Sequence, residues 1–497
     1  MSDNRRQSSR RRATWLLGCA QIYLLGTLLL AACAPAPTAT PLPTASATVT
    51  ATRTLSPTPS PSPTATSTST PQPTATPDAQ KQLVDFLNSS AALQTLSQYS
   101  TAEGLNISDA QSRLQDPKAD VTLKDSKGSP FEVLVDTQTQ TPLFIKENGA
   151  WREVTWKDEG EKANLPIGTI LDFGDNGSKL PSYKVLGGEQ FNFITLSGSV
   201  YEKWWKNGGM DYWTIFAHAN NLPVSINPVF FHDDIYNIEN PTPDNVREFM
   251  KNRLRKILNY AALPKNDPHQ IKLSSIVLAN EPFVVYNGNI IWQGSPVSNM
   301  DYPLYRAFGQ NWITEAYICM DQVARELGLT PGKDFRVIGV NLAIINQAES
   351  DTIVRVEKDI GQRLGIPWQQ VPFDIGEEHH LGNTSGQRNT TVPLDQIEVN
   401  KLIAHYQDIA RAVSSTVFIT ELDGLYPDEK LLAEKIGDVI TAAGESGVVQ
   451  GINLFRALNL SDPNDPWKQN DFFAPPDHSK RVYFYSILKA YSQLLKR

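Results

Sequence analysis

From about residue 164 to its end, the chain alternates short apolar runs, rich in β-branched residues, with longer stretches of helical periodicity. The strand-like runs are Leu165–Leu171, Phe191–Ser197, Pro223–Phe231, Leu273–Glu281, Arg336–Leu342, Phe373–His380, Thr416–Asp423 and Val448–Phe455. The clearest helical stretches are Thr242–Leu263, Tyr305–Leu327, Asp428–Ala443 and Asp477–Leu495. Eight such repeats predict an α/β fold, a (β/α)8 TIM barrel. A doubly wound sheet also alternates, but no G-x-G-x-x-G phosphate loop follows a strand here, which favours the barrel.

The composition before the barrel changes twice, so we expect four segments. They are a lipoprotein signal peptide with its lipobox (1–33), a disordered Pro/Thr/Ser-rich stalk (34–77), a small N-terminal α+β module (78–160) and the barrel (161–497). Within the module, one amphipathic helix and three short strands are predicted, at Ala79–Leu96, Pro130–Val135, Pro142–Ile145 and Trp151–Trp156. We expect the module to pack beside the barrel.

The first segment has the order of parts that marks an exported protein. Five arginines are followed by an apolar stretch from Trp15 to Ala32 and then by Leu30-Ala31-Ala32-Cys33. The last four residues resemble the lipobox of bacterial lipoproteins. That resemblance implies that Cys33 becomes the first mature residue and carries lipid, with the protein on the extracellular face of the bacterial cell membrane. An uncleaved single-pass anchor is the alternative.

Residues 34–77 are almost only Pro, Thr, Ser and Ala, with Arg53 as their one charge. Such a segment has too few apolar side chains to offset the entropy of ordering. This composition predicts an extended, semi-rigid stalk that holds the folded body away from the membrane. A disordered linker without a spacing role is the other interpretation.

The charge and the cysteines exclude several partners. The chain carries −8, and residues 1–32 contribute five Arg and one Asp, so the remainder carries −12. An acidic body argues against nucleic acid and against an anionic lipid surface, which leaves the lipid anchor as the only membrane contact. Cys19 and Cys33 lie in the targeting segment, so Cys319 is alone in the folded part and no intramolecular disulfide is possible there.

Two glutamates each close a strand-like run. Glu281 follows S-S-I-V-L-A-N, and Glu421 lies in T-V-F-I-T-E-L-D with Asp423 two residues on. A β/α barrel places its chemistry at the carboxyl ends of its strands, and two carboxylates that face one cleft are what glycoside hydrolysis requires. Each motif alone is an ordinary strand end. Together, on the fourth and seventh predicted strands of one barrel, they predict a catalytic pair.

Several short motifs follow the order in which glycoside hydrolase family 10, the endo-β-1,4-xylanase family, carries them. They are Ile167-Gly168-Thr169, Gln190-Phe191-Asn192, Asn227 to His232, Ala279-Asn280-Glu281, Ile375 to Leu381 and Ile419 to Asp423. The region from about Leu165 to Leu494 resembles a divergent member of this family. The resemblance implies a retaining glycosidase that cleaves β-1,4-linked polysaccharide, with xylan as the first candidate.

The resemblance also implies roles for single residues. Glu281 would be the general acid/base and Glu421 the nucleophile, with carboxyl groups about 5–5.5 Å apart. His380 and Asp423 match the pair that orients the nucleophile. Asn280 would hydrogen-bond the 2-hydroxyl of the bound sugar.

The sugar-binding surface departs from the family pattern. Asn227 stands where the family has a His, Glu378 where it has a Gln, and Phe455 where it has a Trp, although Trp467 could still supply a stacking face. His232 is either a sugar contact or a satisfied core histidine. We expect these positions to bind substrate, and their divergence leaves the polymer open.

Extra residues lie in Pro282–Pro303 and Gly382–Val392, the loops after the fourth and sixth predicted strands. Tyr286, Trp292 and Tyr302 in the first loop either form new stacking platforms or pack as ordinary loop residues. Loops at this end of a barrel border its active face.

No cofactor is expected, because this hydrolysis needs only water. Glu377-Glu378-His379-His380 could suggest a metal site. In a strand, however, alternate side chains face opposite ways, so only Glu378 and His380 share a face. Two ligands do not close a site, and we predict no metal.

Two other functions stay open. Because the binding residues have diverged, the barrel could bind oligosaccharide at the cell surface without cleaving it. The solute receptor of a sugar importer shares the lipobox and the acidic body, but such receptors have two lobes with a hinge, unlike one run of eight β/α units.

Overall fold

The computed structural model describes residues 77–115, 120–125, 127–171, 189–196, 209–230, 238–286, 289–293, 295, 302–343, 345–382, 391–426, 428–455, 473–474, 479–480 and 482–495. All described residues belong to one compact unit, Thr74–Arg497. Among them, no helix combines the length and apolar character needed to cross a bilayer. Cys319 is buried as a free thiol.

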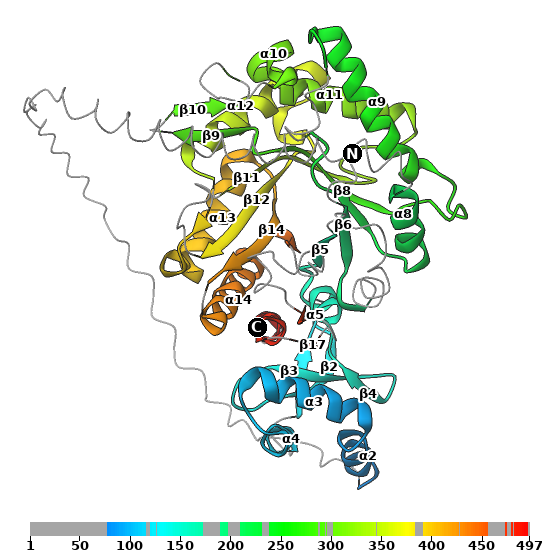
Figure 1. Cartoon of the computed structure of the whole chain (residues 1–497), viewed down its shortest axis with the longest axis vertical. Helices are drawn as coiled ribbons and strands as arrows, with labels where there is room; N and C mark the ends of the chain where they lie inside the picture. Colours follow the sequence, from blue (N-terminus) through cyan, green and yellow to red (C-terminus); the bar gives the residue numbers. More distant parts are fainter. Residues whose placement is uncertain are drawn as a thin grey trace, which may run out of the picture. The chain divides into compact units, whose positions relative to one another are not determined.

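Eight parallel strands form a closed barrel (Figure 1). In barrel order they are β5 (Ile167–Leu171), β6 (Phe193–Leu196), β7 (Val224–Ile226), β8 (Leu273–Asn280), β11 (Arg336–Leu342), β12 (Asp374–Gly382), β14 (Val417–Leu425) and β15 (Val449–Leu454). The ring closes where Ile452, Asn453 and Leu454 of β15 pair with Ile167, Gly168 and Thr169 of β5. The predicted (β/α)8 barrel is confirmed.

Helices follow the strands and cover the outside of the barrel (Figure 1). They are α8 (Gly209–Ala219), α9 (Pro243–Ala262), α10 (Pro303–Phe308), α11 (Trp312–Glu326), α12 (Gln347–Leu364), α13 (Val399–Val413), α14 (Glu429–Ser446) and α15 (Val482–Leu495), with short 3-10 turns at Gly309–Asn311, Trp368–Gln370 and Leu394–Gln396. Two starts are fixed by capping boxes, at Thr242 with Asn245 and at Asn346 with Glu349. Each box satisfies backbone N–H groups that the first turn leaves unpaired.

One layer inside the barrel consists of Phe193, Val277, Ile338 and Phe418, from β6, β8, β11 and β14. The rings of Phe193 and Phe418 meet edge to face at 5.8 Å. Small residues on other strands leave room for them, because a Cβ on Gly168 would lie 2.2 Å from the Phe193 ring. The interior is therefore filled by side chains, as a barrel of this strand number requires.

Two predicted elements are shorter than the sequence pattern indicates. In the described part of the run Pro223–Phe231, only Val224–Ile226 is strand, and Phe230 returns as an isolated bridge to Ala279. The helical run Tyr305–Leu327 is interrupted at Gly309, whose φ of +59° ends α10 before α11 begins. Glycine reaches this region without the steric cost of a Cβ.

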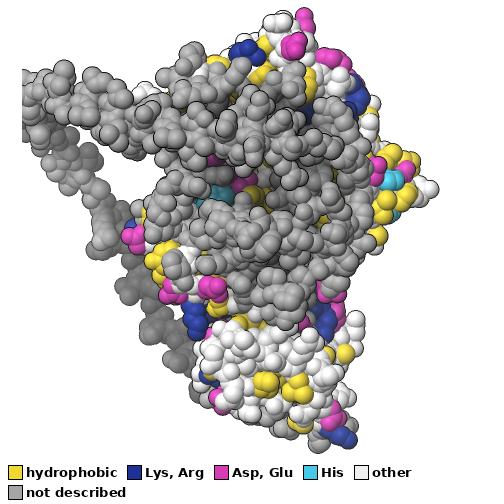
Figure 2. Space-filling view, viewed as in Figure 1, with side chains coloured by type: hydrophobic (Ala, Val, Ile, Leu, Met, Phe, Trp, Pro, Cys, Tyr) yellow, Lys and Arg dark blue, Asp and Glu magenta, His cyan; other side chains and the backbone are white. Residues whose placement is uncertain are grey.

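The small module holds an antiparallel sheet in the order β1-β2-β3-β4. Its elements are α2 (Pro77–Leu87), α3 (Ser90–Glu103), α4 (Ile107–Gln115), β1 (Asp120–Lys124), β2 (Pro130–Val135), β3 (Pro142–Glu147), β4 (Ala150–Glu153) and α5 (Trp156–Ala163). The predicted single helix Ala79–Leu96 is wrong, since Ser89 caps a second helix by accepting from the Ala92 N–H. The predicted strand Trp151–Trp156 ends at Glu153, since Thr155 caps α5. Figure 2 shows little hydrophobic surface on the visible face of the module.

The module packs on the last helix of the barrel through Trp156. Its indole is fully buried, stacks on Phe484 of α15 at 5.0 Å and donates from Nε1 to the Phe484 carbonyl at 3.0 Å. The side chain of Asn192 accepts from the Ile167 N–H and donates to the Lys157 carbonyl, which joins α5 to the first barrel strand. Module and barrel therefore share one core.

The loop after β8 folds back as a hairpin of β9 (Phe283–Tyr286) and β10 (Asn289–Trp292). Trp292 is 2% exposed and packs on Phe283, while Tyr302 is 1% exposed and packs on Trp312. Of the two interpretations of these aromatic residues, internal packing is therefore correct for Trp292 and Tyr302. Three further short strands are β13 (Thr391–Val392), which pairs with β12, and the pair β16 (Phe473–Ala474) and β17 (Ser479–Lys480).

Candidate active site

Four neighbouring strands bring the predicted polar residues together at their carboxyl ends. The strands β8, β11, β12 and β14 lie side by side in the barrel, and their pairing sets Asn280 beside Asn341, Glu378 beside Glu421 and His380 beside Asp423. Because side chains alternate along a strand, residues paired in this way point to the same face. In Figure 2, histidine and acidic side chains come to the surface near the centre of the barrel.

Glu281 follows the last residue of β8 and adopts a left-handed backbone conformation with φ of +41°. Its N–H donates to the Asn341 carbonyl at 2.7 Å, so the neighbouring strand holds this conformation. A glutamate with positive φ is uncommon, and strained backbone positions of this kind cluster at functional sites. The side chain of Glu281 is half-buried.

Glu421 lies on β14 and is 9% exposed. Its Oε1 accepts from the amide groups of Asn227 and Asn341, each at 3.3 Å. Burial raises the pKa of the Glu421 carboxyl well above its ordinary value, the charge of Glu378 raises it further, and Glu281 contributes in the same direction. Glu281 and Glu421 therefore act on each other electrostatically across one mouth of the barrel.

His380 is held between three carboxylates. Its Nδ1 lies 2.5 Å from Asp423 Oδ1, and its Nε2 lies 3.4 Å from Glu378 Oε2 and 3.6 Å from Glu421 Oε2. Burial alone would lower the pKa of the imidazole, but the charge and hydrogen bond of Asp423 outweigh burial and raise that pKa well above its ordinary value. The ring of Phe455 meets the imidazole edge to face at 5.9 Å.

Asn341 is a residue of this site that the sequence analysis missed. Its Nδ2 lies 2.6 Å from both Asn280 Oδ1 and Glu378 Oε1, besides the longer contact to Glu421, and Thr420 donates to its Oδ1. It is fully buried in β11. The signal was present, since an amide in the otherwise apolar run V-I-G-V-N-L needs a buried partner.

The residues on the opposite face of β12 form a separate buried network. Glu377 is fully buried, and its carboxylate lies 2.8 Å from His405 Nε2 and 3.3 Å from His379 Nε2 and accepts from the Ile345 N–H at 3.1 Å. Burial opposes ionisation here, but the charge of His405 and the hydrogen bonds from His379 and His405 lower the pKa of Glu377 to about 2. Glu377 and His379 thus face the helices while Glu378 and His380 face the mouth, as the strand period predicts.

Glu378, His380 and Glu421 form the one group of three ligating side chains found among the described residues that could hold a metal ion, with one ligand atom of each within 4.8 Å of the others. Adjacent strands supply the group, two residues from β12 and one from β14. Of the remaining predicted site residues, Asn280, Asn227 and Phe455 lie at this mouth. His232, Trp467 and Cys33 lie outside the described residues.

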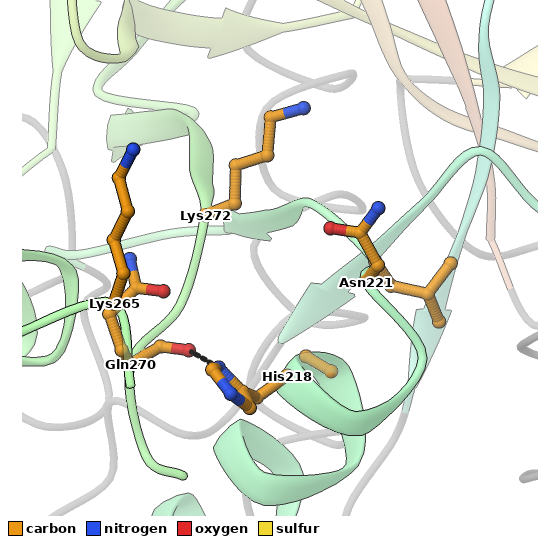
Figure 3. A pocket seen from close by; sticks show the side chains of 7 residues that line it. His218, Asn221, Lys265, Gln270 and Lys272 are labelled. Carbon is orange, nitrogen blue, oxygen red and sulfur yellow. Dashed lines mark hydrogen bonds between the residues drawn. The ribbon is translucent and has the colours of Figure 1, made fainter. Parts of the chain in front are cut away.

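A hollow of ≈ 420 Å³ lies away from this mouth (Figure 3). Its lining includes Asn221 and Leu222, which precede β7, and Lys272, which precedes β8. His218 Nδ1 donates to the Gln270 carbonyl beside it, at 3.0 Å. This end of a β/α barrel serves stability rather than chemistry, so we place the candidate active site at the carboxylates.

Comparisons with known proteins agree with the barrel. No family model matches the sequence, and no curated protein matches it. Among solved structures, the chain is similar to native xylanase 10B from Thermotoga maritima, with a TM-score of 0.51 at 15% identity over 69% of this chain and 100% of that one. It is also similar to the Penicillium canescens endo-1,4-beta-xylanase XylE, with a TM-score of 0.52 at 14% identity over 69% of this chain and 98% of that one. A third similar structure is a GH10 xylanase from Bispora sp. MEY-1 with xylobiose. Its TM-score is 0.50 at 14% identity over 68% of this chain and 100% of that one.

The fold is thus a (β/α)8 barrel like that of GH10 xylanases. At 14–15% identity, the likeness carries the fold alone.

Proposed function

We propose that this protein is a retaining glycoside hydrolase of the GH10 type that cleaves β-1,4-linked polysaccharide. The observation that carries the proposal is the pair of carboxyl groups at one barrel mouth. Glu281 follows β8 and donates its N–H to the Asn341 carbonyl, and Glu421, buried on β14, accepts from the side chain of the same Asn341. A carboxylic acid beside a carboxylate nucleophile is the equipment of double displacement.

In the first step, Glu281 donates its proton to the glycosidic oxygen while a Glu421 oxygen attacks the anomeric carbon. The glycosidic C–O bond breaks, and a glycosyl ester forms on Glu421. In the second step, the Glu281 carboxylate takes a proton from water, the water oxygen attacks the anomeric carbon, and the ester bond breaks. Two inversions retain the β configuration.

The neighbours support these roles. Asp423 fixes the His380 imidazole, whose positive charge near Glu421 lowers the pKa of that carboxyl and so works against burial and Glu378, which raise it. Asn341 donates to Asn280 Oδ1, so the Asn280 amide has its N–H groups to donate to a sugar hydroxyl. Such hydrogen bonds strengthen as the transition state forms.

Xylan is the substrate we propose first, because the solved structures of similar fold are named as xylanases. The test is reducing-sugar release from xylan, arabinoxylan, mixed-linkage glucan and mannan, with Glu421→Ala and Glu281→Gln beside the parent. We expect release from xylan, a loss of at least about 10³-fold in Glu421→Ala, and a loss of about 10²–10⁴-fold in Glu281→Gln. Equal activity in parent and Glu421→Ala would contradict the proposal.

A barrel that binds oligosaccharide without cleaving it is the second candidate, favoured by Glu378 and Phe455 at positions where the family pattern has Gln and Trp. If the parent binds xylo-oligosaccharides in calorimetry but releases no reducing sugar from any of the four polymers, this candidate replaces the first. A two-lobed solute receptor is disfavoured, because the barrel strands form one closed ring.

We also propose that the protein is held at the extracellular face of the membrane by lipid on Cys33, with residues 34–77 as the stalk. The support is the Leu30-Ala31-Ala32-Cys33 motif and the Pro/Thr/Ser composition that follows it. Expressed in a bacterium, the full chain should partition into the detergent phase. The mature parent should begin at Cys33 and carry the mass of attached lipid, whereas Cys33→Ala should carry none, and a parent that keeps residues 1–32 or carries no lipid would contradict lipidation.

A further inference from the structure

We propose that Glu378, His380 and Glu421 bind a divalent transition-metal ion of the Zn²⁺ class in the substrate-free protein. The inference starts from the contacts of His380. Its Nε2 makes no hydrogen bond of good geometry with a described residue, yet it is buried and lies 3.4 Å from Glu378 Oε2 and 3.6 Å from Glu421 Oε2. One ligand atom from each of the three side chains thus lies within 4.8 Å of the other two.

The distances fit a metal ion better than a hydrogen bond. Zn²⁺ binds imidazole nitrogen and carboxylate oxygen at about 2.0–2.2 Å, so two ligands at tetrahedral corners lie about 3.4 Å apart. The two separations from Nε2 have this length. They are long for a charge-assisted N–H···O bond, which is about 2.7–2.9 Å.

The atoms on the far side of each ligand are already held. Asp423 binds the Nδ1 of His380, which presents Nε2 to the centre. Asn341 donates to Glu378 Oε1, and Asn341 and Asn227 donate to Glu421 Oε1, so the Oε2 atom of each glutamate is the one turned to His380. Such outer partners orient ligands and tune affinity in metal sites.

The charge of the cluster favours a cation as well. Glu378, Glu421 and Asp423 offer three carboxylates to one imidazole, and each of the three is at most 9% exposed. Buried carboxylates are costly unless they are paired or bind metal. The prediction of no metal counted only the ligands of β12, and the third ligand comes from β14 across the register pair of Glu378 with Glu421.

An ion at this point would occupy an oxygen of Glu421 and so block its attack on a sugar. This inhibitory consequence rests on the proposed function, whereas binding of the ion does not. A three-ligand site with an open fourth position accepts water in place of a fourth side chain.

The test uses the full mature chain without a histidine tag, titrated with ZnCl₂ in a calorimeter near neutral pH. We expect one ion per chain, and we expect Co²⁺ in place of Zn²⁺ to give the intense visible absorption of tetrahedral coordination. Glu378→Gln keeps the shape of the side chain and its contact with the Asn341 amide, and it should weaken Zn²⁺ binding at least about 100-fold. Asp423→Asn changes only the partner of the far nitrogen of His380, and it should weaken Zn²⁺ binding about 10–100-fold.

The matched control is His218→Gln, a histidine beside the hollow at the other end of the barrel. Its affinity for Zn²⁺ should equal that of the parent. Circular dichroism and thermal melts establish that each variant is folded. Absence of Zn²⁺ binding in the parent, or undiminished affinity in folded Glu378→Gln, overturns the site.

Zn²⁺ should also inhibit polysaccharide cleavage in competition with substrate, and a chelator should restore it. If Zn²⁺ binds but the protein keeps its full hydrolytic activity at saturating Zn²⁺, the proposed inhibition is wrong. If the parent cleaves nothing, the calorimetric arm still decides whether the ion binds, so the two proposals fail separately.

Discussion

Glu377 and Glu378 are adjacent on β12 but have different environments, because successive side chains of a strand point to opposite faces. Glu377 faces the helices, where His405, His379 and the Ile345 N–H compensate its charge. Glu378 faces the barrel mouth beside Glu421. The stabilising ion pair and the candidate reaction centre therefore lie on the same strand but on its opposite faces.

Glu377 makes stability depend on pH in a predictable direction. Its folded pKa of about 2 lies below the ordinary 4.5, so its contribution is present above pH 4.5 and is lost as the pH falls toward 2. The pKa of His405 is raised because the charge of Glu377 outweighs burial, so its contribution is present below pH 6.5 and fades as the pH rises past the folded pKa. The cluster stabilises most between these limits.

We therefore expect Glu377→Gln to lower the free energy of unfolding by about 3 kcal/mol between pH 4.5 and 6.5. The difference from the parent should shrink below pH 4.5. Denaturant unfolding across this range measures it. Glu132→Gln, which removes a surface pair with Lys146, is the control and should change stability by about 0–1 kcal/mol at every pH. A pH-independent difference for Glu377→Gln would contradict the account.

At the residue scale, sequence could identify the ends of strands but not the contacts between them. Glu281 and Glu421 were predictable because each closes an apolar run. Asn341 was not identified, because a single amide in a strand shows its importance only when Asn280, Glu378 and Glu421 converge on it. The group of Glu378, His380 and Glu421 was missed for the same reason, since its members come from two strands.

At the element scale, the barrel depends on pairs of small and large residues in facing positions. Gly168 of β5 admits the Phe193 ring, and Gly451 of β15 leaves room for Phe418. The strand positions were predictable from apolar periodicity. The ends of elements were less so, because local signals such as the Ser89 cap and Gly309 override a longer periodic pattern.

Gly168→Ala tests this packing. Its Cβ would lie 2.2 Å from a Phe193 ring atom, so the ring must shift, and we expect a loss of about 1–3 kcal/mol in the free energy of unfolding. The matched control is Gly437→Ala in α14, where the new Cβ meets its nearest atom at 3.5 Å. That change should be neutral or stabilise the helix by up to about 1 kcal/mol. Equal losses in the two variants would refute the packing argument.

At the scale of the whole molecule, the small module is part of the barrel's core rather than an independent appendage. Trp156 of α5 and Phe484 of α15 are stacked although 328 residues separate them. Sequence predicted that the module packs beside the barrel but could not predict where, because no local pattern encodes a contact at that separation.

Trp156→Ala tests the shared core. Losing a fully buried indole should cost about 3–5 kcal/mol, and the unfolding transition of the barrel should move with that of the module. The control is Trp151→Ala on β4, where the indole is half-buried and the loss should be smaller. A barrel transition that stays in place while the module melts earlier would show that the two are independent.

The central claim is that Glu421 bonds covalently to the sugar during the reaction. Its most direct test is to treat the protein with an activated 2-fluoro β-xylobioside, which slows the second step, and to locate the label by peptide mass spectrometry. We expect one glycosyl group per chain, attached at Glu421 and absent from Glu421→Ala. A label on Glu378 or Glu281 instead, or hydrolysis of xylan with inverted product and no label at all, would contradict it.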